Sequence, residues 1–158
     1  NKETLCKNVY ERQQKANELR TLLEKELAKA HIEAKFTWDI GATENEMQEA
    51  LLLIRQAQWR WDCGVSSHGG SFHAPQETMR ILGHGLNKVF QARMLISKVL
   101  VAHGYTDNVP LPDITTKEKA QQYIGLDMAV EKADKDKFLK EIVPEWLQKA
   151  KANGRIVN

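Results

Sequence analysis

The most constraining feature of the sequence is a segment of about ten helical turns, Glu3–Asp39, that contains no glycine or proline. Its apolar residues recur mostly at steps of three and four, which places them on one stripe of an α-helix. They are Leu5, Val9, Ala16, Leu19, Leu23, Leu27, Ala30 and Ala34. Such a helix exceeds the usual globular length, so we expect it to need a partner, from this chain or another.

Turn and capping residues predict further helices along the chain. Gly41 can adopt the left-handed conformation that ends the first helix. Thr43 and Glu46 have the spacing of a capping box that starts a second helix. Gly69-Gly70 ends that helix, and Pro75 suits the first position of a third helix, where its missing N–H costs nothing.

The C-terminal part of the sequence predicts two more helices. Thr115 and Glu118 indicate a capping box for a short helix that ends at Gly125. A last helix is expected over residues 127–153, with a kink at Pro144. No segment shows the period-two alternation of a strand. The sequence therefore predicts an all-α fold of long antiparallel helices in an extended bundle, as one domain over residues 1–158.

Composition and charge exclude several classes of protein. The net charge of +2 gives no basic surface for nucleic acid. The longest apolar runs, such as Ala50–Ile54, are too short for a transmembrane segment. Cys6 and Cys63 lie in no Cys-x-x-Cys spacing, so neither a zinc site nor a covalently attached haem is expected within the chain, and the two cysteines have no assigned role. A start at Asn1, inside a charged helical pattern, indicates a fragment of a longer protein.

A tryptophan pair in the second helix has two interpretations. Trp59 and Trp61 point about 200° apart on a helix, so one face cannot bury both. The helix could be sandwiched between two others, with both indoles in the core. Alternatively, one indole could cover a flat partner such as a porphyrin or a second subunit, with Arg60 pairing with a carboxylate.

Two histidines flank the glycine turn before Pro75. His68 and His73 could present a neutral imidazole to a metal, although this spacing on a loop by itself favours a histidine that hydrogen-bonds a helix end. The other histidines, His31, His84 and His103, stand in no recognisable triad, and the chain shows no catalytic residues.

Several stretches, in order along nearly the whole chain, resemble the C-terminal region of pentahaem, ammonia-forming cytochrome c nitrite reductases. They are His31–Lys35, Trp38–Glu44, Gln58–Asp62, Ser67–Gly69, His73–Pro75, Pro112–Gln121, Ile124–Leu126 and Asn153–Gly154. The resemblance implies a periplasmic protein that reduces nitrite to ammonium with six electrons. It also implies haem c, calcium in the whole protein, and haem-attachment and catalytic regions upstream of residue 1. The chain itself would be an inactive, haem-capping and dimerisation domain.

The resemblance also implies roles for individual residues. His73, in the His-Ala-Pro stretch, would be the distal axial ligand of a haem iron, and bis-histidine ligation would limit that iron to electron transfer. Trp59, Trp61, Arg60 and His68 would lie beside the haem. The expected partners are a second copy through the long helices, the haem-bearing N-terminal region and a membrane-associated electron-donor cytochrome. The alternatives are a non-redox helical interaction module and a small metal-binding protein using His68 and His73.

Overall fold

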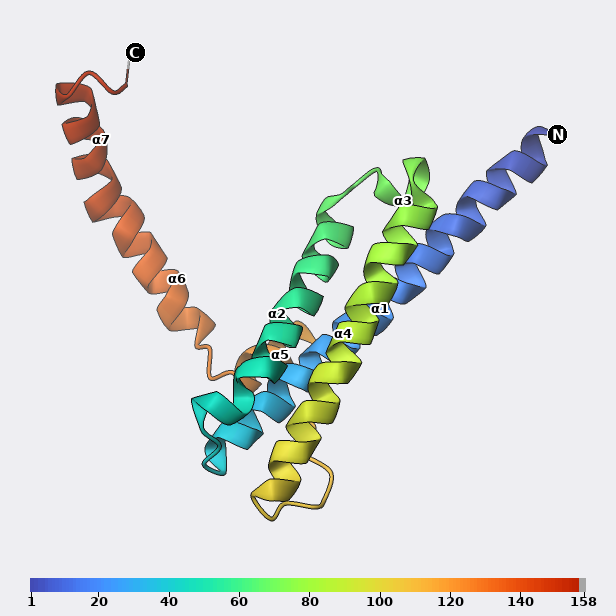
Figure 1. The fold of residues 1–158 in the computed structure, drawn as a ribbon. Helices are drawn as coiled ribbons and strands as arrows, with labels where there is room; N and C mark the ends of the chain where they lie inside the picture. The colour runs from blue at the N-terminus through green and yellow to red at the C-terminus, as the bar shows by residue number, and fades with distance from the viewer. Residues whose placement is uncertain (157–158) are drawn as a thin grey trace. The chain divides into compact units, whose positions relative to one another are not determined.

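The computed structural model describes residues 1–156, and its regular elements in that range are all helices (Figure 1). They are α1 (Lys2–Asp39), α2 (Glu44–Ser66), α3 (Gly70–His73), α4 (Pro75–Ala102), α5 (Lys117–Tyr123), α6 (Met128–Lys137), a π-helical turn (Phe138–Ile142) and α7 (Val143–Ala152). The predicted all-α class is confirmed. The chain forms two compact units, which meet in sequence between Leu111 and Pro112.

The first unit has its core where α1, α2 and α4 pack on one another. The buried apolar residues form one cluster that runs along all three helices. The cluster consists of Leu23, Leu27, Ala30, Ala34, Ala42, Met47, Ala50, Leu53, Ile54, Ala57, Leu82, Leu86, Val89, Ala92, Ile96 and Leu100. From Ala16 onward the stripe predicted on α1 is buried, except for the half-buried Leu19, but the N-terminal end of α1 extends beyond the other helices of this unit (Figure 1). Leu5 and Tyr10 on that end are each 66% exposed.

Helices that follow one another in the first unit run in opposite directions (Figure 1). α2 runs opposite to α1, but α4 reverses direction again after the turn at α3 and runs parallel to α1 (Figure 1). Glycine makes the parallel pair close: a Cβ built on Gly85 of α4 would lie 2.6 Å from a methyl carbon of Leu23 on α1. The bundle is thus mixed in direction, because two consecutive turns separate α1 from α4.

Most helix ends lie where their local residues predicted them. Gly41 has φ +99°, Thr43 and Glu46 form the capping box of α2, and Pro75 occupies the first turn of α4. The cap of α5 was placed one residue too early: Thr116 accepts from the Lys119 N–H. The Thr115 hydroxyl instead donates to Asp113 at 2.6 Å, so the preceding acidic residue competes for it.

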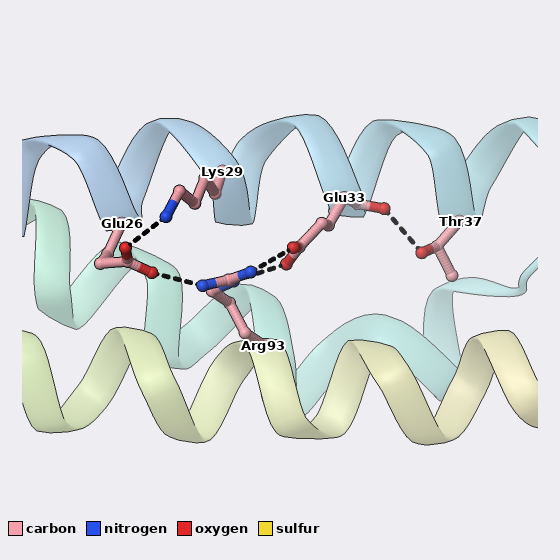
Figure 2. A network of polar contacts seen from close by, with 5 residues as sticks. All are labelled: Glu26, Lys29, Glu33, Thr37 and Arg93. Carbon is pink, nitrogen blue, oxygen red and sulfur yellow. Dashed lines mark hydrogen bonds and ion pairs between the residues drawn. The ribbon is translucent and has the colours of Figure 1, made fainter. Parts of the chain in front are cut away.

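A polar network crosses the interface between α1 and α4 (Figure 2). Arg93 of α4 holds Glu33 with two hydrogen bonds, Nη2 to Oε1 at 2.6 Å and Nε to Oε2 at 2.8 Å. Its Nη1 donates to Glu26, whose other oxygen accepts from Lys29 at 2.6 Å. Hydrogen bonds to both carboxylates, with Glu33 the larger cause, raise the pKa of the Arg93 guanidinium. Because the partners come from two helices, the network fixes their register.

The second unit contains α5, α6, the π-helical turn and α7, and none of its described residues is buried. The sequence predicted one kinked helix over residues 127–153. This prediction is wrong, because a π-helical turn just before Pro144 divides the segment into α6 and α7. Pro144 cannot donate a backbone hydrogen bond, and the extra residue of a π turn accommodates its ring. Phe138 and Trp146 meet edge-on across this turn, with ring centroids 5.4 Å apart.

Within residues 1–156 no helix is both long enough and apolar enough to cross a membrane.

Candidate functional site

The turn between α2 and α4 positions His73. Its backbone N–H donates to the Gly69 carbonyl at 2.8 Å, and Ala74 N–H donates to Gly70 at 2.9 Å, so the short helix α3 holds the residue rigidly before Pro75. The imidazole lies over Gly69: a Cβ there would be 2.9 Å from Cδ2 and 3.6 Å from Nε2. The Phe72 ring meets it edge-on, with centroids 4.8 Å apart.

The His73 side chain is exposed, and neither ring nitrogen has a hydrogen-bond partner among the described residues. A histidine that caps a helix end would have one, so that interpretation of His73 is wrong. Its nitrogens are available to an outside ligand. His68 is also exposed, but the part of the chain that the structure describes holds no group of three His, Cys, Asp or Glu residues arranged around a metal position.

The tryptophan pair divides between the core and the surface. Trp61 is half-buried against the core, and its Nε1–H is buried without a hydrogen-bond partner among the described residues. Trp59 is 71% exposed, so the interpretation that places both indoles in the core is wrong. Arg60 donates to the Gln56 carbonyl at 2.8 Å and makes no described carboxylate contact. Of these two indoles, Trp59 is the one that offers a free aromatic face.

A small polar cavity next to α3 was missed by sequence reasoning. It has a volume of about 70 Å³ and lies among α1, the end of α2, α3 and the start of α4. Its lining residues are Gln13, Ala16, Asn17, Arg20, Gly64, Ser71, Thr78 and Leu82. The Nε–H of Arg20 is buried with no described partner. The sequence did contain a sign of this cavity: Arg20 lies four residues after Ala16 and three before Leu23, so its charged side chain falls beside the apolar stripe of α1.

Both cysteines are free thiols, Cys6 exposed on α1 and Cys63 half-buried on α2. They lie on different helices and in no Cys-x-x-Cys-His sequence, so the chain itself offers no covalent attachment for haem.

The family model for cytochrome c552 matches residues 1–154. The chain belongs to the cytochrome c552 family. It is 73% identical over 154 residues to a cytochrome c-552 of Bacteroides fragilis and 71% identical to one of Bacteroides thetaiotaomicron. A cytochrome c-552 of Porphyromonas gingivalis is 63% identical over 155 residues. Each comparison covers 98% of this chain but 31% of the relative, so the chain spans about a third of the length of these relatives.

Family membership corrects two expectations about function. The matched family and relatives are named cytochrome c552, an electron-carrying cytochrome, so the assignment to ammonia-forming nitrite reductases, with its enzyme activity, is wrong. The alternative of a non-redox helical module is wrong for the same reason. The prediction of an enzyme failed because a histidine on a turn can indicate a ligand to iron, but it does not indicate which reaction takes place at that iron. None of these names mentions calcium.

The cytochrome c552 family implies haem c, and the described residues fit one part of its binding. Haem c requires thioether bonds and axial ligands. The exposed, unbonded imidazole of His73 fits an axial ligand, and the exposed Trp59 fits an aromatic cover. The free, separated cysteines do not fit the attachment.

Proposed function

We propose that this chain serves electron transfer in a c-type cytochrome by supplying His73 as an axial ligand to haem iron. The observation that carries the proposal is the exposed imidazole of His73, which has no described hydrogen-bond partner and is held in place over Gly69. In this proposal the haem is attached to residues outside the 158 of this chain, in an N-terminal region that would be a partner of the present helices.

The chain's own residues have three tasks in this function. The backbone bonds from His73 to Gly69 and from Ala74 to Gly70 fix the position of the ligand before α4 begins. The edge of Phe72 limits rotation of the imidazole. His73 must be neutral, because only an unprotonated nitrogen can donate electrons to the metal. Haem supplies a one-electron redox centre, and occupation of both axial positions favours electron transfer over substrate binding.

The experiment replaces His73 in the haem-loaded full-length protein and reads axial ligation by electron paramagnetic resonance. We expect His73→Ala to convert one low-spin haem signal to high spin. His73→Met should keep it low-spin and raise its reduction potential, as methionine ligation does. His31→Ala is the matched control, because His31 is also exposed on a helix of this unit. Unchanged low-spin signals in His73→Ala would refute the proposal, and loss of a signal in His68→Ala would reassign the ligand.

Gly69 provides a second test, because it acts on the ligand only through its position. In Gly69→Ala the new methyl group would overlap Cδ2 of His73 and displace the ring. We expect a shifted low-spin signal at the same haem, whereas Gly83→Ala, on α4 with no neighbour within 4 Å of the new methyl group, should leave it unchanged.

We further propose that the exposed N-terminal end of α1 forms a homodimer interface. Two observations support it: no residue of α1 before Ala16 is buried, and Leu5 and Tyr10 leave large apolar surfaces open. Sedimentation equilibrium should show a dimer that Leu5→Glu disrupts and the exposed-site control Lys15→Glu does not. We also propose, from the same electron-transfer role, that the protein lies in the periplasm and receives electrons from a membrane-associated donor cytochrome.

A further inference from the structure

The polar cavity beside α3 is lined by polar side chains from three helices. Gln13, Asn17 and Arg20 are spaced four and three residues apart, so they lie on one face of α1. Ser71 of α3 and Thr78 of α4 face them across the cavity. The Thr78 hydroxyl donates to the Ala74 carbonyl at 3.1 Å and is not available as a donor. The amides, the guanidinium and the Ser71 hydroxyl have no described partner and can all donate.

The cavity carries a positive charge that no protein group balances. The Nε–H of Arg20 is buried without a partner, and no aspartate or glutamate lines the cavity. Two other arginines of this unit show the contrast: Arg93 is held by Glu26 and Glu33, and Arg80 by Glu77. Arg20 as a whole is half-buried, but its Nε–H is buried, and a buried donor normally has a hydrogen-bond partner. The Nε–H of Arg20 is therefore available to an acceptor from outside the described residues.

The size of the cavity limits the acceptor. Its volume of about 70 Å³ is roughly half that of an engineered cavity of about 150 Å³ that binds benzene. This space suits the head of a carboxylate or another small oxyanion and is too small for a ring system. The guanidinium edge matches such an acceptor in geometry as well as charge.

We propose that this cavity binds a carboxylate or a similarly small oxyanion through Arg20, with Ser71, Asn17 and Gln13 as further donors. The oxyanion has two possible sources. One is a propionate of the haem that His73 ligates, since Ser71 precedes His73 by two residues on α3, and this source rests on the function proposed above. The other is a free anion from solution, which does not depend on that function.

The first experiment follows the Arg20 Nε–Hε resonance of the ¹⁵N-labelled 158-residue protein, assigned through its own side-chain bonds. Sodium acetate is added against sodium chloride at equal ionic strength. We expect a saturable shift with acetate, which the backbone amide of Ser71 in the cavity lining reports as well. Read at Ser71, binding should be at least about tenfold weaker in Arg20→Lys, which keeps the charge but lacks Nε–H. Arg12→Gln, at an exposed position of the same helix, should bind as the wild type does. No saturable shift with acetate would overturn the proposal and leave water as the occupant.

The second experiment identifies the source in the haem-loaded full-length protein. If a haem carboxylate occupies the cavity, Arg20→Gln lowers the reduction potential of one haem, because a nearby positive charge is removed, and Arg12→Gln does not. An unchanged potential with a positive acetate result assigns the site to a free anion. The loss of low-spin signal in His73→Ala is measured separately, so failure of the haem-ligand function and failure of the anion site give different results.

Discussion

Replacing Arg93 should destabilise the first unit far more than replacing Arg80, although both arginines lie on α4 and both hold a glutamate with two hydrogen bonds. Arg80 bonds Glu77 through Nε at 2.7 Å and Nη2 at 2.6 Å, so its geometry matches that of Arg93 with Glu33. The difference is exposure. The Arg80 and Glu77 side chains are 54% and 52% exposed, whereas those of Arg93 and Glu33 are 28% and 13% exposed.

The magnitude follows from what each substitution leaves behind. Arg93→Met strands the carboxylate of Glu33 and leaves Glu26, whose side chain is only 8% exposed, with Lys29 alone. Removing one partner of a fully buried pair costs about 3–5 kcal/mol. Partial exposure of Arg93 and the remaining Lys29 reduce this, so we expect about 2–4 kcal/mol. Arg80→Met breaks a solvent-exposed pair that water screens, and it should leave the free energy of unfolding nearly unchanged.

Urea unfolding at neutral pH, followed by circular dichroism at 222 nm, measures both free energies of unfolding. The cooperative transition reports the first unit, because the buried residues of the described chain all lie in it. Arg93→Lys should fall between the wild type and Arg93→Met, since lysine keeps the charge but not the two-pronged contact. If the Arg93→Met and Arg80→Met variants unfold within about 0.5 kcal/mol of each other, the reasoning from burial is wrong.

Three further predictions concern helix contacts and ends. Gly85→Ala should lower the free energy of unfolding by about 1–2 kcal/mol, because its new methyl group meets the buried side chain of Leu23. Gly83→Ala, with nothing within 4 Å of its new methyl group, should raise the free energy of unfolding by about 0.5–1 kcal/mol. Equal effects of the two substitutions in urea unfolding would contradict the close approach of α4 to α1 at Gly85. Hydrogen bonds within the capping box and from His103 lower the pKa of Glu46 from 4.5 to about 2, so its ionised form stabilises the fold above pH 4.5 and that stabilisation is lost as the pH falls through about 2. Between pH 4.5 and 2, the melting temperature of the Glu46→Gln variant should therefore fall less than that of the wild type. Identical dependence of the two melting temperatures on pH would argue against the hydrogen bonds to Glu46. Pro144→Ala restores a backbone donor, so we expect slower amide exchange in the π-helical turn, and unchanged exchange would show that proline does not cause the turn.

Local chemistry made many helix ends predictable. A glycine that can take positive φ, a threonine three residues before a glutamate, and a proline at a helix start each act within a few residues. Gly41, the capping box of α2 and Pro75 were therefore placed correctly. The N-cap of α5 was misplaced by one residue because the Thr115 hydroxyl bonds Asp113 and Thr116 caps the helix instead. The local sequence offers both threonines as caps and does not show which of them Asp113 engages.

The sequence by itself determined the all-α class, the long first helix and the presence of His73 on a glycine turn before a proline, because each depends on residues close together in the chain. Only the tertiary structure decided that Trp59 is exposed while Trp61 packs on the core, since this depends on which face of α2 meets the other helices. The Arg93 network and the unpaired Arg20 likewise join segments far apart in sequence. Periodicity predicts that a helix has a buried face, but the partner of that face is set by how the helices pack.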